Sequence, residues 1–283
     1  MSPLRVASQL DDEEILNMLI EKTHFTNYLL KECPLLHLIA SCKPEKYTPF
    51  KKTLDYIKSN HQLNHQTILN SPDDQSKTVL EICIQNNHFN LISLILNELT
   101  DKEAFDANGQ LPIHLAAKYG THTLYELLSQ HSCLSFNTNI NNDNPLHVAA
   151  QYNKFSFINR LLLFEKAFVD KLDAVNSYQP MVKCTNRSGL TPFQLAIVKG
   201  HSKCVEELMQ SPFVDLEVTE TENNYSIYHL CILHSNLETL RIFLNKKSDK
   251  FLNPLFIRSK KNETPLHLAC KLGKTNIFIK LIF

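Results

Sequence analysis

A short pattern recurs six times along this chain of 283 residues and constrains its fold more than any other feature. The copies read TVLEIC, LPIHLA, NPLHVA, TPFQLA, SIYHLC and TPLHLA, and they begin at Thr78, Leu111, Asn144, Thr191, Ser226 and Thr264. Successive copies start 33, 33, 47, 35 and 38 residues apart. A period of this length is typical of proteins that stack one supersecondary unit many times.

Each copy predicts the first turn of a helix. Five of the six begin with Thr, Ser or Asn, whose side chain can accept a hydrogen bond from an unpaired N–H group of that turn, and Leu111 is the exception. Proline follows in four copies, where its fixed φ suits the helix and its missing N–H costs nothing. Histidine comes three residues after the first position, and we expect His114, His147, His229 and His267 to bond to the cap or to the neighbouring repeat rather than to catalyse.

Small residues and glycines also recur at fixed places. Alanines, and at equivalent places Cys83, Cys231 and Cys270, are interpreted as small buried residues that let the first helix approach its neighbours closely. Glycine stands two residues before the first position or nine residues after it, which predicts left-handed turns. Asparagine, which also tolerates this conformation, replaces glycine before three of the copies. Apolar stripes after each first helix predict a second helix in every repeat.

In this combination the segments FDANGQLPIHLAAKYG, TNRSGLTPFQLAIVKGH and NETPLHLACKLGK resemble ankyrin repeats. The resemblance covers about residues 73–283, and it starts near Leu30 if PLLHLIA at Pro34 is a degenerate earlier copy. It implies an all-α ankyrin-repeat solenoid of about six to seven helix-turn-helix units with projecting hairpin fingers. We therefore expect a helical cap over residues 1–32 and a repeat array over 33–283 whose last repeat is uncapped.

Two departures from the period predict insertions, near residues 164–183 and 246–257. We expect the first to form an extended finger on one face of the stack, a place where repeat proteins often carry specificity. Before the repeats, the acidic run from Asp11 to Glu14 precedes apolar residues and predicts an amphipathic helix that caps the first repeat.

Composition excludes several classes of function. Lys plus Arg and Asp plus Glu both total 29, so no overall field draws the molecule to nucleic acid. The eight cysteines form no CxxC pair and no zinc-site spacing, and we expect free thiols and no metal or cofactor. Neither a signal peptide nor a membrane-spanning run is present, which indicates a cytoplasmic chain. Catalytic fingerprints are missing as well.

We therefore expect a non-catalytic scaffold or adaptor that binds a protein partner. The resemblance implies that finger tips and the exposed ends of the first helices form the binding surface. On the fingers these are Asn108, Asn141, Arg187, Asn223 and Lys261, and on the helices they are Lys118, Tyr119, Gln151, Tyr152 and Lys199. Tyr119 and Tyr152 hold equivalent places and could form a shared aromatic platform, although packing between repeats explains them equally well.

Two other functions stay open. The chain could be the cytosolic ankyrin region of a larger membrane protein, such as an ankyrin-type transient receptor potential cation channel. An enzyme would require an appended catalytic domain that these residues do not contain.

Overall fold

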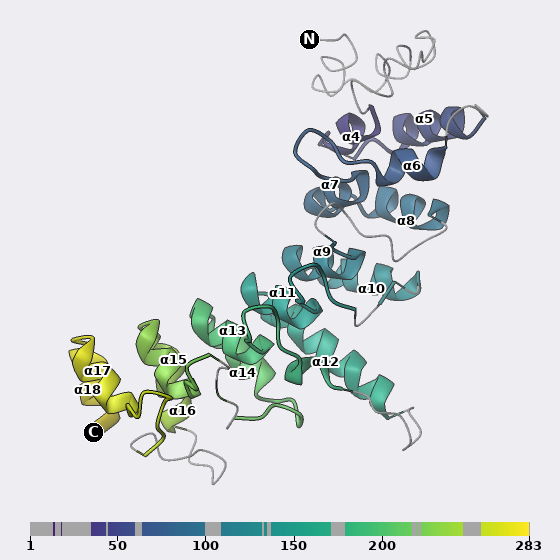
Figure 1. Ribbon diagram of the computed structural model, residues 1–283. Coiled ribbons are helices and arrows are strands. Elements are labelled where there is room, and N and C mark those ends of the chain that lie inside the picture. Colours follow the sequence, from purple (N-terminus) through teal and green to yellow (C-terminus); the bar gives the residue numbers. More distant parts are fainter. Residues whose placement is uncertain are drawn as a thin grey trace. The chain divides into compact units, whose positions relative to one another are not determined.

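In the computed structural model the described residues form helices joined by turns and loops, and they contain no β-strand (Figure 1). The described residues are Glu14, Met18, 35–43, 45–59, 64–99, 109–131, 133–134, 137–170, 179–216, 219, 222–245 and 256–282. The predicted N-terminal cap, apart from two residues, and most of the insertion near 246–257 lie outside these ranges. The chain divides into two compact units, residues 1–135 and residues 136–283, called unit 1 and unit 2 below.

Unit 1 is built from helix pairs. Its described helices are α4 (Leu35–Ala40), α5 (Tyr47–Ser59), α6 (His65–Asn70), α7 (Val79–Asn86), α8 (Phe89–Glu98), α9 (Pro112–Tyr119) and α10 (His122–Gln130). The pair α4 and α5 packs against α7 and α8, and α7 packs against α9. The degenerate copy near Pro34 therefore supplies a helix pair that stacks on the next repeat, and it differs from the others by a further helix, α6, before Thr78. Its histidine, His37, bonds through Nε2 to the carbonyl oxygen of Ser71 at 2.9 Å.

Unit 2 contains four repeats. Its helices are α11 (Pro145–Gln151), α12 (Phe155–Val169), the short 3-10 helix η1 (Met181–Lys183), α13 (Pro192–Lys199), α14 (Ser202–Leu208), α15 (Ile227–Leu233), α16 (Leu237–Asn245), α17 (Pro265–Lys271) and α18 (Thr275–Ile282). The first helices α11, α13, α15 and α17 pack one on the next, and the second helices α12, α14 and α16 do the same.

Four of the five predicted side-chain caps are present, and Ser226 precedes its helix without a side-chain bond to the backbone of the first turn. The side chains of Thr78, Asn144, Thr191 and Thr264 each accept a hydrogen bond from the N–H group three residues later, at 3.3, 3.1, 3.2 and 3.4 Å. Leu111 makes no such side-chain bond, as its apolar side chain requires. Capping residues of this kind typically stabilise a helix by about 1 kcal/mol. The first helices therefore begin where the sequence pattern places them.

The histidine that recurs in four of the six copies has a direct structural explanation. In unit 2, Nδ1 of His229 accepts from the N–H group of Ser226 at 3.3 Å, and Nε2 donates to the carbonyl oxygen of Glu263 at 3.0 Å. Nε2 of His147 donates to the carbonyl oxygen of Leu190 in the same way, at 3.0 Å. One ring thus holds its own helix start and the residue before the next repeat's cap, which confirms the structural role expected for these side chains.

The turns follow two columns of positive φ. Every described residue with positive φ stands two residues before or nine residues after the first position of a repeat: Ser76, Asn87, Gly109, Gly120, Asn142, Asn153, Gly189, Gly200, Asn224, Ser235, Asn262 and Gly273. The glycine and asparagine turns predicted from the sequence are confirmed. The second column also contains two asparagines and one serine that the glycine pattern did not reveal. Asparagine accepts this conformation at modest cost, so the turn persists without glycine.

The small-residue column packs as expected, with one correction. Cys83 and Cys231 are fully buried, as are the alanines at equivalent positions. Burial raises the pKa of both thiols well above its ordinary range, which makes them unreactive. Cys270, which we expected to be buried, is exposed. It stands one position later in its repeat than Cys231 does in its own.

The first insertion does not begin as a finger. Residues Phe164 to Val169 continue α12, which is 15 residues long, whereas α14 has 7 and α16 has 9. The expectation of an extended finger over this segment is therefore wrong for its first part, because its apolar residues lengthen the second helix instead. Residues 171–178 lie outside the described residues. Glu165, buried on the extension, accepts a hydrogen bond from the N–H group of Met181 at 2.5 Å and ties η1 to α12.

A matched pair of substitutions tests the left-handed turns. Gly200 and Gly273 occupy the same place in two repeats, with φ of 74° and 63°. A Cβ on Gly200 would lie 2.8 Å from Oδ1 of Asn236, whereas a Cβ on Gly273 would meet nothing within 4 Å. Gly273→Ala should cost about 1 kcal/mol because alanine resists positive φ. Gly200→Ala should cost about 2 to 3 kcal/mol because Asn236 must also move. Denaturant titration measures both, and equal losses would contradict this packing.

The histidine bonds predict a pH dependence. Burial lowers the pKa of His229, while the bond to the Glu263 carbonyl oxygen and the nearby Glu263 charge oppose the shift. The unfolded chain then binds the proton more readily than the folded one. Stability should be complete above the unfolded pKa of about 6.5 and should fall as the pH drops through the lower folded value. Thermal melts at about pH 7.5 and about pH 5 should show a smaller loss for His229→Gln than for the unchanged chain. An equal loss in both proteins would show that His229 does not contribute.

Candidate interaction surface

The fingers of unit 2 are shaped by side chains that bond to their own backbone. Oδ1 of Asn186 accepts from the N–H groups of Ser188 and Leu190 at 3.0 and 3.2 Å, and its N–H group donates to the carbonyl oxygen of Leu190 at 3.0 Å. Asn139 makes the same set of bonds to Asn141 and Asp143. Short polar side chains close turns in this way. The finger turns 139–143 and 186–190 are therefore pre-ordered.

Neighbouring fingers are also joined by their backbones. The N–H group of Arg187 donates to the carbonyl oxygen of Asn141 at 3.0 Å, and the N–H group of Lys260 donates to that of Asn223 at 2.9 Å. Because Arg187 and Lys260 make equivalent bonds, they hold the same position in their fingers. Lys261 holds the next position. The expected set of finger residues therefore mixes two adjacent positions of the turn. Asn141, Arg187 and Lys261 are exposed, Asn223 is half-buried, and Asn108 lies outside the described residues.

The expected helix-end residues of unit 2 reach the surface to different degrees. Gln151, the last residue of α11, is half-buried, whereas Tyr152 is 44% exposed. Lys199 ends α13 and is exposed. Tyr152 belongs to unit 2 and Tyr119 to unit 1, and a shared aromatic platform stays a prediction.

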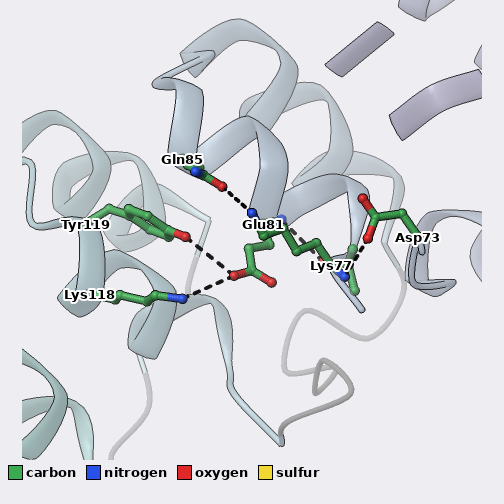
Figure 2. A network of polar contacts seen from close by, with 7 residues as sticks. Asp73, Lys77, Glu81, Gln85, Lys118 and Tyr119 are labelled. Carbon is green, nitrogen blue, oxygen red and sulfur yellow. Dashed lines mark hydrogen bonds and ion pairs between the residues drawn. The ribbon is translucent and has the colours of Figure 1, made fainter. Parts of the chain in front are cut away.

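In unit 1 a buried carboxylate occupies the place of the recurring histidine. Glu81 stands three residues after Thr78 and is 3% exposed. Its Oε1 accepts from Nζ of Lys118 at 3.4 Å and from the hydroxyl group of Tyr119 at 3.5 Å (Figure 2). Unlike a histidine ring, an ionised carboxylate has no proton to donate to a carbonyl oxygen. Glu81 instead accepts from the end of the next first helix, α9.

This network engages two residues that we expected to meet a partner. Nζ of Lys118 also lies over the ring of Tyr119, 5.2 Å from its centre. Burial raises the pKa of Tyr119, the charge of Lys118 opposes this, and the charge of Glu81 adds to it. The hydroxyl group therefore stays protonated and able to donate. The polar groups of Lys118 and Tyr119 thus hold α9 against α7, which is the packing role left open for them.

Sequence reasoning missed Glu81 as a member of the site. The signal was present, because TVLEIC places a carboxylate where four other copies place histidine. Beside the same helix, Nζ of Lys77 donates to Oε1 of Gln85 at 2.9 Å, and Oδ1 of Asp73 accepts from the N–H group of Lys77 (Figure 2). Polar side chains thus follow α7 from its preceding turn to its last residues.

The described residues offer nothing that resembles a metal centre or a membrane span. No group of three or more His, Cys, Asp or Glu side chains among them is arranged to hold a metal ion. Within the same ranges, no helix combines the length and the apolar character needed to cross a bilayer.

Comparison with known proteins places the chain in a family. A family model for ankyrin repeats, described as three copies, matches residues 80–173 and 166–254. This chain belongs to the ankyrin repeat family. The crystal structure of the ankyrin repeat domain of Bcl-3 resembles this chain with a TM-score of 0.63 and 17% sequence identity. The match covers 87% of this chain and 96% of the Bcl-3 domain. The all-α ankyrin fold expected from the sequence is thus confirmed.

The curated relatives are longer proteins. Mouse rabankyrin-5 (Mus musculus) is 26% identical over 189 residues, which cover 64% of this chain and 14% of that protein. Putative E3 ubiquitin-protein ligase XBAT31 of Arabidopsis thaliana is 28% identical over 137 residues, which cover 47% of this chain and 29% of that protein. The chain therefore spans less than a third of either relative. Ankyrin repeats are generally protein–protein interaction modules, although one of these relatives is named as a ligase.

A double-mutant cycle tests the Glu81 network. Lys118→Met should cost about 1 to 3 kcal/mol, because it leaves a buried carboxylate without its cation. In a Glu81→Gln background the same change should be nearly neutral, since the amide carries no charge and Gln194 is tolerated at the equivalent place in its own repeat. Urea titration of the four proteins gives the coupling energy. Additive losses would mean that Lys118 does not stabilise the fold through Glu81.

Proposed function

We propose that this ankyrin repeat chain is a scaffold or adaptor that binds a protein partner through its fingers and the exposed ends of its first helices. The finger geometry of unit 2 carries the proposal, because hydrogen bonds fix each turn while Asn141, Arg187 and Lys261 remain exposed. Side chains on pre-ordered turns lose less conformational freedom on binding than those on a flexible loop. Family membership supports the same class of function.

The proposal extends to location and to chemistry. Cys83, Cys184, Cys204, Cys231 and Cys270 are free thiols, which supports a reducing compartment such as the cytoplasm. We propose a binding role without catalysis, because the helix-end and finger residues offer contact groups rather than a nucleophile held by a base. The channel alternative stays a prediction, since neither the described helices nor the relatives' names bear on it.

The fingers can be tested by charge reversal. Arg187→Glu combined with Lys261→Glu should weaken a captured protein partner about tenfold, or about 1.4 kcal/mol, without changing the fold. The partner is first captured by pull-down with the intact chain, and its affinity is then measured by titration calorimetry. Circular dichroism verifies the helical content of each variant.

A matched control carries the same charge change elsewhere on unit 2. Lys166→Glu combined with Lys183→Glu alters two exposed lysines on α12 and η1, outside the finger turns 139–143, 186–190 and 259–263. This variant should bind like the unchanged chain. Equal affinity for all three proteins would remove the fingers from the binding surface, and failure to recover any specific protein partner would count against the scaffold function itself.

A further inference from the structure

One edge of unit 2 combines positive charge with exposed apolar side chains. It consists of the last residues of each first helix and the turn that follows, and it is called the inner edge here. Its segments are residues 151–156, 198–203, 233–238 and 271–276, from α11 and α12 to α17 and α18 (Figure 1).

Hydrogen bonds place these segments side by side. Nδ1 of His201 donates to the carbonyl oxygen of Ala150 at 2.7 Å, and the side chain of Asn236 donates to the carbonyl oxygen of Ile197. Between the last two turns lies an open hollow of about 320 Å³, lined by Ser235, Leu237 and residues 273–277. The four turns therefore form one continuous edge with a depression at its end.

The charge of the inner edge differs from that of the whole chain. The complete sequence has 29 basic and 29 acidic residues. In the inner edge there are five lysines, Lys154, Lys199, Lys203, Lys271 and Lys274, and a single carboxylate, Glu238. Glu238 pairs with Arg241 at 3.7 Å, and Lys271 pairs with Glu263 at 2.7 Å. The remaining four lysines leave this edge with an excess of positive charge.

The positive charge of this edge affects the pKa of a neighbouring histidine, His234. Burial lowers the pKa of His234, and the positive charge of Lys199 lowers it further. Lys199 thus lies close enough for its charge to act on the next repeat, and both effects favour the neutral form of the His234 ring.

Apolar side chains are interleaved with the lysines. Tyr152, Phe155, Leu233 and Leu272 are 44%, 39%, 40% and 41% exposed. They make up four of the twelve exposed large apolar side chains among the described residues, although the inner edge is a small part of them. Nζ of Lys203 lies 5.3 Å from the centre of the Phe155 ring, so charge and apolar surface meet directly. Exposed apolar groups gathered in this way mark contact sites more often than isolated ones do.

We propose that the inner edge of unit 2 binds an acidic peptide segment that carries apolar side chains. This inference rests on the protein-binding function proposed above and names the chemistry of the partner. Carboxylates of the segment pair with Lys199, Lys203 and Lys274, and its apolar side chains cover Leu233 and Leu272. A nucleic acid would pair with the lysines but leave Leu233 and Leu272 uncovered, and membership in the ankyrin repeat family favours a peptide over an anionic membrane surface.

Synthetic peptides test the proposal with the full chain. The probe is a fluorescein-labelled peptide that alternates Glu or Asp with Leu or Phe, and its binding is followed by fluorescence anisotropy. One comparison peptide replaces every acid with its amide, and another keeps the acids but replaces Leu and Phe with Ser. The probe should bind at least about tenfold more tightly than either, because both kinds of contact are needed. It should also weaken as salt is added.

Variants of the chain locate the site. Lys199→Glu combined with Lys274→Glu should weaken the probe by about tenfold or more, and Leu233→Ser combined with Leu272→Ser should do the same. The control, Lys166→Glu combined with Lys183→Glu, makes the same charge change outside the inner edge and should leave binding unchanged. The proposal would be overturned if the control variant weakened the probe equally. It would also be overturned if the probe bound no more tightly than the comparison peptide in which Ser replaces Leu and Phe. Tighter binding of a single-stranded oligonucleotide or of phosphatidylserine vesicles would overturn it too.

The experiments distinguish failure of the inner-edge proposal from failure of the proposed scaffold function. If a captured protein partner binds the Lys199→Glu, Lys274→Glu variant as tightly as the unchanged chain, the inner-edge proposal fails while the scaffold function stands. If no protein partner is recovered but the probe binds as expected, the inner edge stands and the scaffold function loses its support.

Discussion

The bond from a buried histidine to the next repeat is the interaction on which the stacking of repeats in unit 2 depends. In His229 one ring nitrogen accepts from the start of its own helix and the other donates to the carbonyl oxygen just before the next cap. A buried polar group of the backbone is costly unless it is paired. The ring therefore satisfies groups of two repeats at once and fixes how one repeat stacks on the next. The fingers and the inner edge of unit 2 are presented by this regular stacking.

Glu81 stands where other repeats have histidine, and its ionised carboxylate cannot donate a hydrogen bond to the next repeat. Its carboxylate is buried beside α7 and accepts from Lys118 and Tyr119 of α9 instead. The two repeats remain joined, but through the ends of their helices rather than through the backbone before a cap. Lys118 and Tyr119 are thereby drawn into the fold, while Lys199 at the end of α13 stays at the surface. The residue at the histidine position of one repeat thus decides whether the side chains at the end of the next first helix are exposed or engaged in the fold.

Local chemistry was predicted well from the sequence, and long-range chemistry was not. Thr191 caps α13 and Gly189 turns with positive φ because each depends on neighbours within a few residues. Asn153 and Ser235 escaped notice because glycine was the signal used for their column. The extension of α12 was predicted as a finger, since an apolar insertion fits a longer helix as well as a loop. The register of Arg187 could have been read from spacing, because Arg187 stands four residues before Thr191 whereas Lys261 stands three before Thr264. The partners of Glu81 could not be read from its own copy, because they come from the end of the next first helix.

The account depends most on the protonation state of the histidines that join repeats, and nitrogen NMR of the imidazole rings measures it directly. For His229 the account requires a neutral ring with its proton on Nε2, because Nδ1 must accept from Ser226 and Nε2 must donate to Glu263. That form should persist at about pH 6.5, where an unperturbed histidine would be half charged. A ring protonated on Nδ1 alone, or one that is half charged at that pH, would contradict the claim that this bond holds successive repeats together.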